Sequence, residues 1–524
     1  MNKLVMAFVL VFSTLSVYAD VTLNGVFAEH MVLQRDMPVA VYGTAEPGEQ
    51  VTIAFAGQSK SATAGKDGAW SVKLDAMKVS AVPAAMTVSG KNKLTLNDIL
   101  VGDVWVCSGQ SNMEWVLGAC NRPEDLKQAN FPLIRLFQIR GVVSPNLRTE
   151  VSCFPWTPCT PQSVENFPAV GFYFGRNVHQ QTGIPLGLIR SAQGGTAIEP
   201  WTPYAGLALI PELAKDKETL DQQLKTYLDK LTGMQPKIDA YLTLVRKALS
   251  SNAELPAPPE FPSYPISNNA PQGWNCLYNG YIHPLTQFAI KGVLWYQGES
   301  NCYNADTYFQ KQRALIGGWR KAWNQGDFPF YFVQLANYGN PDTNPGADDG
   351  GWAKLRMAQL KSLTIPNTGM AVAIELADIG NPNDVHAKNK KDVGERLSLW
   401  ALAKDYGKKN LVYSGPLYKS MKIEGSKIRI AFDSVGSGLT VATKKGYDPM
   451  VKEPQGSLKK FAIAGDDKKW VWADAVIDGK TVMVSSPEVP KPVAVRYAFA
   501  ANPDGCNLYN NEGLPASPFR TDAW

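Results

Sequence analysis

Three residues in two distant segments of the sequence have the types that a serine hydrolase needs. Ser111 lies in the segment GQSNM, directly after an apolar run, and Asp384 and His386 lie two residues apart in the segment NDVHAK. A serine hydroxyl becomes a good nucleophile when a base takes its proton, and an imidazole is a reliable base when a carboxylate fixes its tautomer. We therefore expect Ser111 to be the nucleophile, His386 the base and Asp384 the carboxylate that orients the base.

The chain has only four histidines, which narrows the choice of base. His30 lies in a region with a β pattern and His179 in a helical pattern, so both fit a structural role better. His283 remains a rival, although it precedes a predicted strand and such positions usually lie at the opposite edge of a parallel sheet. A structural reading of Asp384 and His386 also stays open, in which the carboxylate caps the helix that follows.

The segment around Ser111 is a weak signal when it is taken alone. A nucleophile elbow of the α/β-hydrolase type would have a second glycine two residues after the serine, whereas this chain has Met113 there. The pattern therefore disfavours the α/β-hydrolase fold.

A tetrahedral intermediate needs hydrogen-bond donors for its oxyanion, each worth about 3 kcal/mol of barrier. The backbone N–H of Ser111 is one candidate, and Gly194 or Gly195 in SAQGGTAIEPW is a second, because glycine lets the main chain approach a substrate closely. A side-chain amide of WYQGESN would be the third, with Gln297 as the first choice and Asn301 as the reserve.

Two other chemistries fit the residues less well. The sequence contains no HExxH motif and no paired-histidine spacing for zinc, so we expect neither a metal nor an organic cofactor. Glu199 and Glu299 could form the paired carboxylates of a glycoside hydrolase, but that reading leaves Asp384 and His386 unexplained.

The middle of the chain has the pattern of a doubly wound parallel sheet. Apolar runs predict buried strands at 104–107, 185–190, 292–296, 330–335 and 370–376, and helical spacing predicts helices at 169–181, 306–323, 352–363 and 388–406. Alternating strands and helices indicate a parallel sheet that is covered on both faces and binds ligands at the carboxyl ends of its strands. The candidate residues all follow such runs, so we expect them to converge at one edge.

A chain of 524 residues exceeds what one hydrophobic core usually holds, so we expect more than one domain. Regions with a β pattern flank the central unit. We expect an N-terminal β-sandwich region at 20–100, a catalytic domain at 101–410 and a C-terminal β region at 411–524 that could pack against the first. Residues 206–272 interrupt the core with charged helical stretches and a proline-rich piece. They predict a helical insertion, which could be a lid or a solvated spacer.

The first 19 residues have one basic residue, a short apolar run and the ending VYA, which predict a signal peptide and an exported, periplasmic or extracellular protein. No later stretch predicts a membrane helix. The net charge of +5, from 52 basic and 47 acidic residues, gives no reason to expect nucleic acid as a partner. The chain has seven cysteines, and Cys153 with Cys159, or Cys276 with Cys302, could form disulfides.

Four segments taken together, GQSNM, SAQGGTAIEPW, WYQGESN and DVHAKNKKDVGERL, resemble the carbohydrate-esterase branch of the SGNH hydrolases, and most closely the sialate O-acetylesterases. The ends of the chain, FAEHMVLQRDMPVAVYGTAEPGE and NLYNNEGLPASPFRTD, also look like that family. The resemblance implies a flavodoxin-like SGNH core with Ser111, His386 and Asp384 as the triad. It departs in two places, at Ala387 where proline is common, and at Gln297, where other SGNH branches have asparagine.

The expected activity is therefore removal of O-acetyl groups from carbohydrate, with O-acetylated sialic acid as the leading substrate. An acetyl esterase of plant polysaccharide such as xylan would share every catalytic residue. A glycan-binding protein with an inactive hydrolase sheet is the alternative from a different class. A sialic acid carboxylate would need an arginine or a cluster of donors, and Arg176, Arg190 and Arg320 all lie in the catalytic region. The oligomeric state is not predicted by the sequence.

Overall fold

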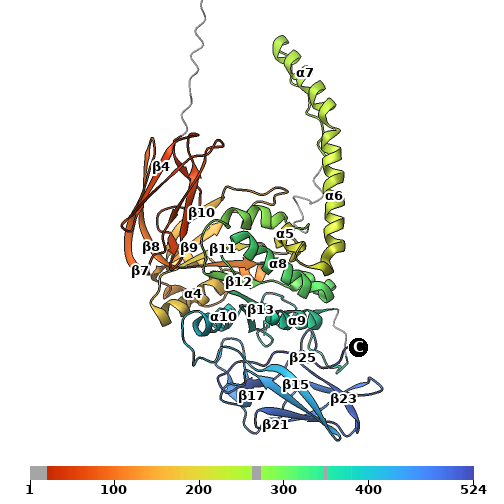
Figure 1. The fold of residues 1–524 in the computed structure, drawn as a ribbon. Helices are drawn as coiled ribbons and strands as arrows, with labels where there is room; N and C mark the ends of the chain where they lie inside the picture. The colour runs from red at the N-terminus through yellow and green to blue at the C-terminus, as the bar shows by residue number, and fades with distance from the viewer. Residues whose placement is uncertain (1–19, 263–272, 347–350, 379) are drawn as a thin grey trace, which may run out of the picture.

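The computed structural model of the chain describes residues 20–262, 273–346, 351–378 and 380–524. Figure 1 shows a β region at one end, an α/β unit in the middle and a second β region at the other end. The expected signal peptide at 1–19 lies outside the described residues. Within the described part of the chain, no helix is both long enough and apolar enough to cross a membrane.

The N-terminal region is a β-sandwich, as predicted. One sheet contains three strands, and a second sheet is built on the first half of β8 (Lys93–Gly109). Buried and exposed residues alternate along β6 (Ala69–Leu74), with Trp70, Val72 and Leu74 facing the interior. The other strands are β1 (Thr22–Leu23) and β3 (Val39–Thr44) in the first sheet, and β2 (Val32–Gln34), β4 (Gln50–Phe55), β5 (Gln58–Thr63) and β7 (Ser80–Ser89) in the second.

Strand β8 belongs to both the N-terminal region and the central sheet. It is 17 residues long. Residues 93–101 pair with β7, and residues 103–109 pair with the central strand β11 (Leu186–Ala192). The expected boundary near residue 100 therefore falls inside a continuous strand.

The central sheet has the predicted doubly wound arrangement. Its order is β10-β9-β11-β8-β12-β13-β14, and every neighbouring pair from β9 to β14 is parallel. Strands β9 and β11 lie on one side of β8, and β12, β13 and β14 lie on the other. The strand order therefore reverses at β8. In a parallel sheet such a reversal opens a crevice at the carboxyl ends of the strands. The five predicted apolar runs coincide with β8, β11, β12 (Gly292–Tyr296), β13 (Phe330–Gln334) and β14 (Thr368–Val372).

The sequence pattern did not predict the two strands at one edge of this sheet. They are β9 (Phe131–Ile139) and β10 (Cys153–Cys159), and β10 pairs with β9 in the antiparallel direction with two register shifts. Proline cannot donate to a β ladder, so Pro132, Pro155 and Pro158 weaken the strand pattern. An edge strand tolerates proline because one of its sides has no ladder to complete.

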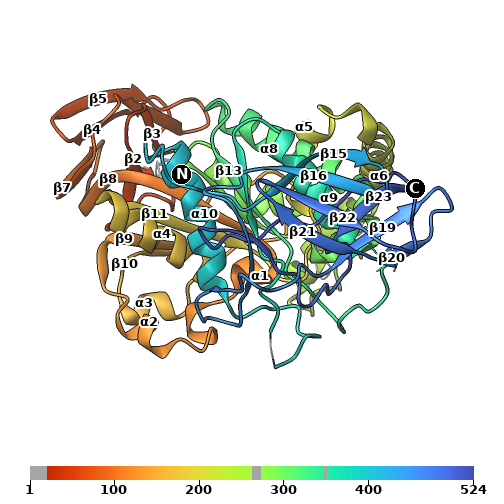
Figure 2. The same ribbon diagram turned by 90° about the horizontal axis from the view of Figure 1, so that it is seen from below.

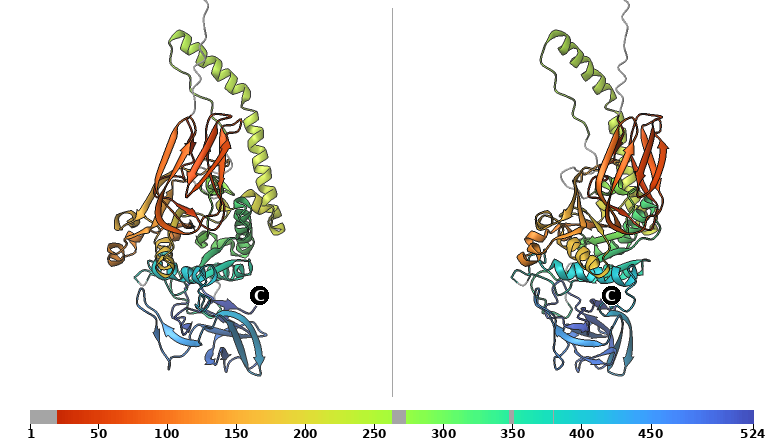
Figure 3. Two further views of the ribbon diagram at one scale, coloured as in Figure 1. Left: turned by 60° about the vertical axis from the view of Figure 1, so that its left-hand side comes forward. Right: turned by 90° about the vertical axis from the view of Figure 1, so that its left-hand side faces the viewer.

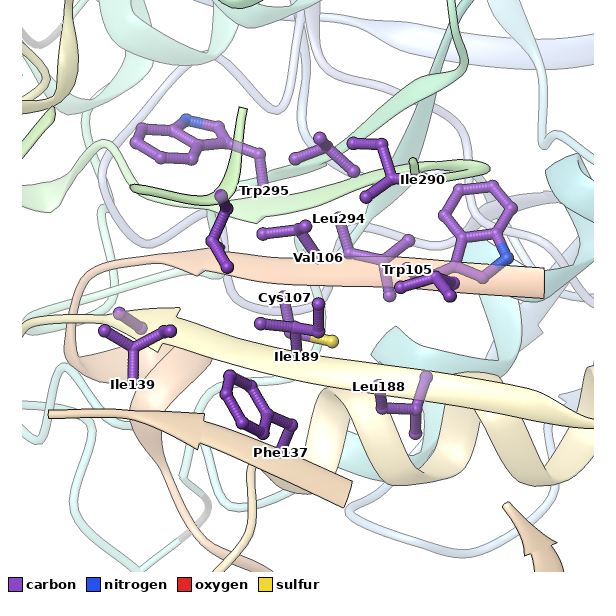
Figure 4. Close-up of a cluster of buried hydrophobic side chains, with 14 of the residues drawn as sticks. Trp105, Val106, Cys107, Phe137, Ile139, Leu188, Ile189, Ile290, Leu294 and Trp295 are labelled. Atoms are coloured by element: carbon purple, nitrogen blue, oxygen red, sulfur yellow. The ribbon is translucent and has the colours of Figure 1, made fainter. Parts of the chain in front are cut away.

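Helices cover both faces of the central sheet, and the aromatic residues show which helix covers which face. On one face, Trp105 of β8 packs against Phe174 of α4 (Ala169–Thr182), with ring centroids 4.9 Å apart. On the other, Trp295 of β12 packs against Trp319 of α8 (Tyr308–Trp323) at 5.9 Å. Figure 4 shows Trp105 and Trp295 in the cluster of buried side chains along the sheet. Helix α10 (Lys390–Lys404) packs beside α4.

The predicted helical insertion projects from the central unit, as Figures 1 and 3 show. It consists mainly of α6 (Ala214–Thr232) and α7 (Gln235–Ser251). Leu220 anchors α6 in a small cluster with Leu207 of α5 (Tyr204–Leu207). The outer helix α7 has only Ala248 buried, so most of the insertion is solvated.

The C-terminal β region has its own hydrophobic core and lies at the end of the molecule opposite the N-terminal region (Figures 1 and 2). The expectation that the two β regions could pack together is therefore wrong. The C-terminal region packs instead beneath α9 (Trp352–Lys361), where Arg356 donates a hydrogen bond of 2.6 Å to the carbonyl of Ala500. Its longer strands are β15 (Leu417–Glu424), β16 (Lys427–Asp433), β17 (Leu439–Thr443), β19 (Phe461–Gly465), β21 (Asp474–Asp478), β22 (Thr481–Ser485) and β23 (Pro492–Tyr497).

Neither of the suggested disulfides forms, because Cys153, Cys159 and Cys276 are free thiols. Cys153 and Cys159 are the two ends of β10, which is seven residues long, and about 3.3 Å per residue separates those ends by about 20 Å. A disulfide needs Cα atoms within about 7 Å. Cys276 donates its thiol to the carbonyl of Gly273 at 3.2 Å.

Candidate functional site

The structure brings Ser111, His386 and Asp384 together at the carboxyl edge of the central sheet. Ser111 Oγ lies 2.9 Å from His386 Nε2, and His386 Nδ1 lies 3.1 Å from Asp384 Oδ1. The carboxylate also accepts a hydrogen bond of 2.9 Å from the backbone N–H of His386. With Nδ1 protonated by this pairing, Nε2 is the acceptor that faces the serine hydroxyl. This arrangement can remove the serine proton as the hydroxyl attacks a carbonyl carbon.

Gly109 allows the turn that presents Ser111. Its φ is +135°, and a Cβ at this position would lie 2.1 Å from the carbonyl oxygen of Tyr296 on the neighbouring strand β12. Only glycine combines this backbone conformation with such close approach. The chain can therefore leave β8 sharply, so that Ser111 becomes the first residue of α1 (Ser111–Glu114).

The segment that carries His386 is an irregular loop between β14 and α10. The side chains of His386 and Asp384 are each 28% exposed. The ring of Trp115 stacks on the imidazole, with centroids 4.9 Å apart and planes 20° apart. Helix α10 begins at Lys390, and the side chain of Asn389 caps it by accepting from the N–H of Asp392 at 3.0 Å. The alternative in which Asp384 caps this helix is therefore wrong.

Gly194 and Gly195 lie on the loop after β11, beside the serine. A Cβ on Gly194 would be 3.4 Å from Ser111 Cβ, which places this glycine against Ser111. The backbone N–H of Gly194 donates to Glu114 Oε2 at 2.9 Å, and Glu114 also pairs with Arg190. An oxyanion would therefore compete with Glu114 for this donor. Gly195 has a φ of +70°, in the left-handed region that favours glycine.

The side-chain amides of Gln297 and Asn301 are buried and bonded within the loop network. Gln297 Nε2 donates to Asn301 Oδ1 at 2.7 Å and to the carbonyl of Thr196 at 3.2 Å. Asn301 Nδ2 donates to Glu199 Oε2 at 2.9 Å. Both amides therefore have protein partners in this conformation, and a role for either one in an oxyanion hole remains a prediction.

Four residues of the site were not predicted from the sequence. Gln110 Oε1 accepts from the N–H of Gly298 at 3.1 Å and so ties the serine segment to the loop after β12. Asn112, Glu114 and Lys390 contact the residues around Ser111 and His386. Their contacts are made with distant segments, which the sequence does not reveal. The only sign of their role in the sequence was that they lie close to Ser111 or His386.

Two ionisable groups lie beside this site, the buried Lys390 and the partly exposed Glu299. Burial lowers the pKa of the Lys390 ammonium to about 8, against a rise caused mainly by Cys120 and Glu299. Burial raises the pKa of the Glu299 carboxyl. Its Oε1 atom accepts from Asn112 Nδ2 at 2.5 Å. These charges are part of one buried network instead of a solvated surface.

The rival groups lie in other contacts. His283 Nδ1 is 2.7 Å from the carbonyl of Arg148. Glu199 pairs with Lys311 at 2.7 Å, whereas Glu299 binds Asn112, so the two carboxylates belong to different networks. Among the described residues, no group of three or more His, Cys, Asp or Glu side chains is placed to hold a metal ion.

The three arginines considered for a substrate carboxylate have different surroundings. Arg176 pairs with Asp125 and Glu395, at 3.0 and 3.2 Å. Arg320 donates to the backbone carbonyl of Phe328 at 2.8 Å, at the amino ends of the strands. Only Arg190 of the three reaches the serine segment, through its ion pair with Glu114.

A loop of the C-terminal β region supports the segment that follows His386. The hydroxyl of Tyr447 lies 2.5 Å from the carbonyl oxygen of Lys388 and 2.7 Å from that of Cys120, and its one proton can be donated to either of them. Asn389 Nδ2 donates to the carbonyl of Gly446 at 2.7 Å. The C-terminal region therefore contacts the site directly.

Comparisons with known proteins identify the family to which the chain belongs. A family model described as carbohydrate esterase, sialic acid-specific acetylesterase, matches residues 269–402. The sialate O-acetylesterase of Mus musculus is 32% identical over 537 residues, covering 94% of this chain and 92% of the mouse protein. That of Homo sapiens is 30% identical over 533 residues, covering 93% of this chain and 90% of its own.

A solved structure matches almost the whole chain. It is a carbohydrate acetylesterase from Xanthomonas citri, 34% identical, with a TM-score of 0.79 over 96% of this chain and 100% of the other. The match extends over both β regions as well as the central sheet. The chain therefore belongs to the sialate O-acetylesterase family of carbohydrate esterases, and it is a carboxylic ester hydrolase.

Proposed function

We propose that this protein removes O-acetyl groups from O-acetylated sialic acid, with Ser111, His386 and Asp384 as its catalytic residues. The hydrogen bond of 2.9 Å between Ser111 Oγ and His386 Nε2 carries the proposal, because residues 275 positions apart have no local reason to meet. The relatives named sialate O-acetylesterase support the substrate class.

The reaction follows from the positions of the protons. Ser111 Oγ attacks the acetyl carbonyl carbon while His386 Nε2 takes the serine proton, and Asp384 stabilises the imidazolium that forms. The imidazolium then gives this proton to the sugar oxygen as the ester bond breaks. Water attacks the acetyl-serine with His386 as the base, which releases acetate and restores the serine.

The proposed oxyanion hole uses backbone N–H groups of the same edge. The N–H of Ser111 lies at the start of α1, where helical N–H groups lack an intrahelical partner. Gly194 or Gly195 is the proposed second donor, and the amide of Gln297 or Asn301 the third. Gly194 can serve once the oxyanion displaces Glu114 from its N–H or shares that donor with it.

Arg190 is the proposed partner for the sialic acid carboxylate. It is the arginine nearest the serine segment among the three considered, and its ion pair with Glu114 is partly exposed, at 22% and 30% of the two side chains. A bidentate arginine–carboxylate contact favours an anionic sugar over a neutral one. The other candidate function is an acetyl esterase of a neutral polysaccharide such as xylan, which the similarity to the carbohydrate acetylesterase of Xanthomonas citri supports.

The catalytic assignment is tested with a chromogenic acetate ester. Ser111→Ala and His386→Ala should each lower kcat by at least about 1,000-fold while the protein stays folded. His283→Ala is the matched control, because this histidine contacts the carbonyl of Arg148 and should leave the rate nearly unchanged. A near-normal rate in either site variant would refute the assignment.

The substrate is tested separately, by measuring acetate release from O-acetylated sialic acid and from acetylated xylan. We expect a higher kcat/KM for the sialic acid and a loss of that preference in Arg190→Gln. Equal values for the two substrates in the unmodified protein would contradict the sialic acid proposal.

We also propose that the protein is exported after cleavage at Ala19. The composition of the first 19 residues supports this proposal. N-terminal sequencing of the protein from the periplasm or medium should begin at Asp20. Recovery of the intact N-terminus from the cytoplasm would contradict it.

A further inference from the structure

Two buried side chains bind the backbone on either side of His386. Asn112 Nδ2 donates to the carbonyl of Val385 at 2.9 Å, and Lys390 Nζ donates to the carbonyl of Ala387 at 2.5 Å. The Lys390 ammonium also donates to Asn112 Oδ1, so the two side chains form one unit. The Val385–His386 and Ala387–Lys388 peptide groups, which lie on either side of His386, are therefore bound by the residue that follows Ser111 and by the first residue of α10.

This unit is fully enclosed. Asn112 is 1% exposed and Lys390 0% exposed. The ammonium lies 5.8 Å from the ring centroid of Trp115 and 5.5 Å from that of Tyr296. Glu299, Cys120 and Asp384 are the titratable groups that act on it, and Glu299 reaches it through Asn112. Burying an ammonium is costly unless it is well bonded, and an apolar side chain could fill the same space at less cost.

The position of these bonds explains why a polar network is retained here. Asp384 and His386 lie on a loop, and their side chains are each 28% exposed. Such a loop gives the imidazole no regular hydrogen-bond ladder that would fix its place. An error of about 1 Å in a reacting group can cost about 100-fold in rate. Bonds to the carbonyls of Val385 and Ala387 hold the backbone on both sides of His386, and this backbone sets where the imidazole lies.

We infer that Asn112 and Lys390 are positioning residues that hold the His386 segment so that Nε2 faces Ser111 Oγ, an inference that rests on the proposed function. They act through His386 and contact no substrate. Glu299 belongs to the same unit, because its Oε1 atom accepts a hydrogen bond of 2.5 Å from Asn112 Nδ2.

The first test is Lys390→Met, which keeps an unbranched chain and removes both N–H contacts. We expect kcat for an acetate ester to fall by about 100-fold and KM to change by less than about threefold, because the loss is in the alignment of His386. The rate at which a fluorophosphonate labels Ser111, followed by intact mass, should fall in parallel, because labelling also needs the serine to be activated by His386.

Arg320→Met is the matched control. Arg320 is another buried cation that donates to backbone carbonyls, of Phe328 at 2.8 Å and of Asn367 at 3.1 Å, at the opposite edge of the sheet. It should lower the melting temperature while kcat and the labelling rate stay within about threefold of the unmodified protein. An equal loss of kcat in this control would overturn the inference, because the effect would then come from general destabilisation.

Asn112→Asp covers the case in which Lys390→Met does not fold. The aspartate keeps the size of the side chain and an acceptor for Lys390, but it lacks the N–H that donates to Val385. Its kcat and labelling rate should also fall, and a folded Lys390→Met or Asn112→Asp protein with normal values would overturn the inference. Ser111→Ala is measured beside them. Activity in Ser111→Ala refutes the proposed function, whereas an inactive Ser111→Ala with a normal Lys390→Met refutes only the positioning role.

Discussion

Replacement of Asp384 by asparagine tests how strongly the carboxylate supports the base. In the structure, Asp384 Oδ1 binds both the backbone N–H and Nδ1 of His386, at 2.9 and 3.1 Å. Asparagine keeps an oxygen acceptor for these bonds, so the loop should remain in place. What it removes is the negative charge that stabilises the imidazolium in the transition state.

The size of the effect follows from distance and exposure. Two unit charges about 4 Å apart interact by about 4 kcal/mol at the effective dielectric constant of about 20 that suits sites near a protein surface. Both side chains are 28% exposed, so water replaces part of this interaction. A loss of about 2 to 3 kcal/mol of transition-state stabilisation corresponds to a fall in kcat of about 30- to 160-fold.

The assay is the initial rate of acetate ester hydrolysis by Asp384→Asn. The rate of Ser111→Ala serves as the background, and circular dichroism checks that each variant is folded. In a fully buried triad, the same substitution costs about 10,000-fold. A fall below about threefold would show that the carboxylate does not support the base. A fall of kcat to the value of Ser111→Ala would show that water does not weaken the interaction between Asp384 and His386.

Three further predictions concern residues around the triad. Trp115→Ala removes the ring stacked on His386 and should lower kcat by about 2- to 13-fold, the equivalent of about 0.5 to 1.5 kcal/mol; no change in kcat would contradict the stacking role. Gly109→Ala should destabilise the fold by at least about 2 kcal/mol in chemical denaturation, because φ is +135° and the new Cβ would meet the carbonyl of Tyr296; an unchanged midpoint would contradict this. Burial lowers the pKa of Lys390 to about 8, whereas a lysine in the unfolded chain has a pKa of about 10.4. Between these two pH values the unfolded state binds more protons than the folded state. The free energy of unfolding therefore rises with pH across this range, by about 3 kcal/mol. The free energy of unfolding of the unmodified protein should therefore rise relative to that of Lys390→Met as the pH increases from about 8 to about 10.4. A difference between the two proteins that does not change with pH would contradict the lowered pKa of Lys390.

The sequence predicted that Ser111, Asp384 and His386 would lie together, because the parallel sheet leaves little choice about where strand ends lie. Ser111 follows β8, and the segment with Asp384 and His386 follows β14, so both must emerge at the same edge. Residue type supplied the rest, since a chain with four histidines offers few bases. The fold class followed from the same alternation of apolar runs and helical spacing.

The contacts that hold the triad could not be predicted in the same way. Lys390 lies in a lysine-rich stretch, which normally indicates a solvated helix face, yet it is fully buried. Its burial depends on Asn112, Trp115 and Tyr296, which come from other parts of the chain. The partner of the Gly194 N–H depends on where Glu114 lies, and no local pattern sets that position.

Strand β8 also limits how the protein can be cut and recombined. Because β8 completes a sheet of the N-terminal region and then continues to the turn before Ser111, a truncation at residue 100 would cut this strand and separate β2 from Val101 and Gly102, with which it pairs. Pulling on the N-terminal region would transmit tension along β8 to Ser111. Grafting of this enzyme onto another scaffold is therefore best done at the chain ends, with the N-terminal region kept as part of the catalytic unit.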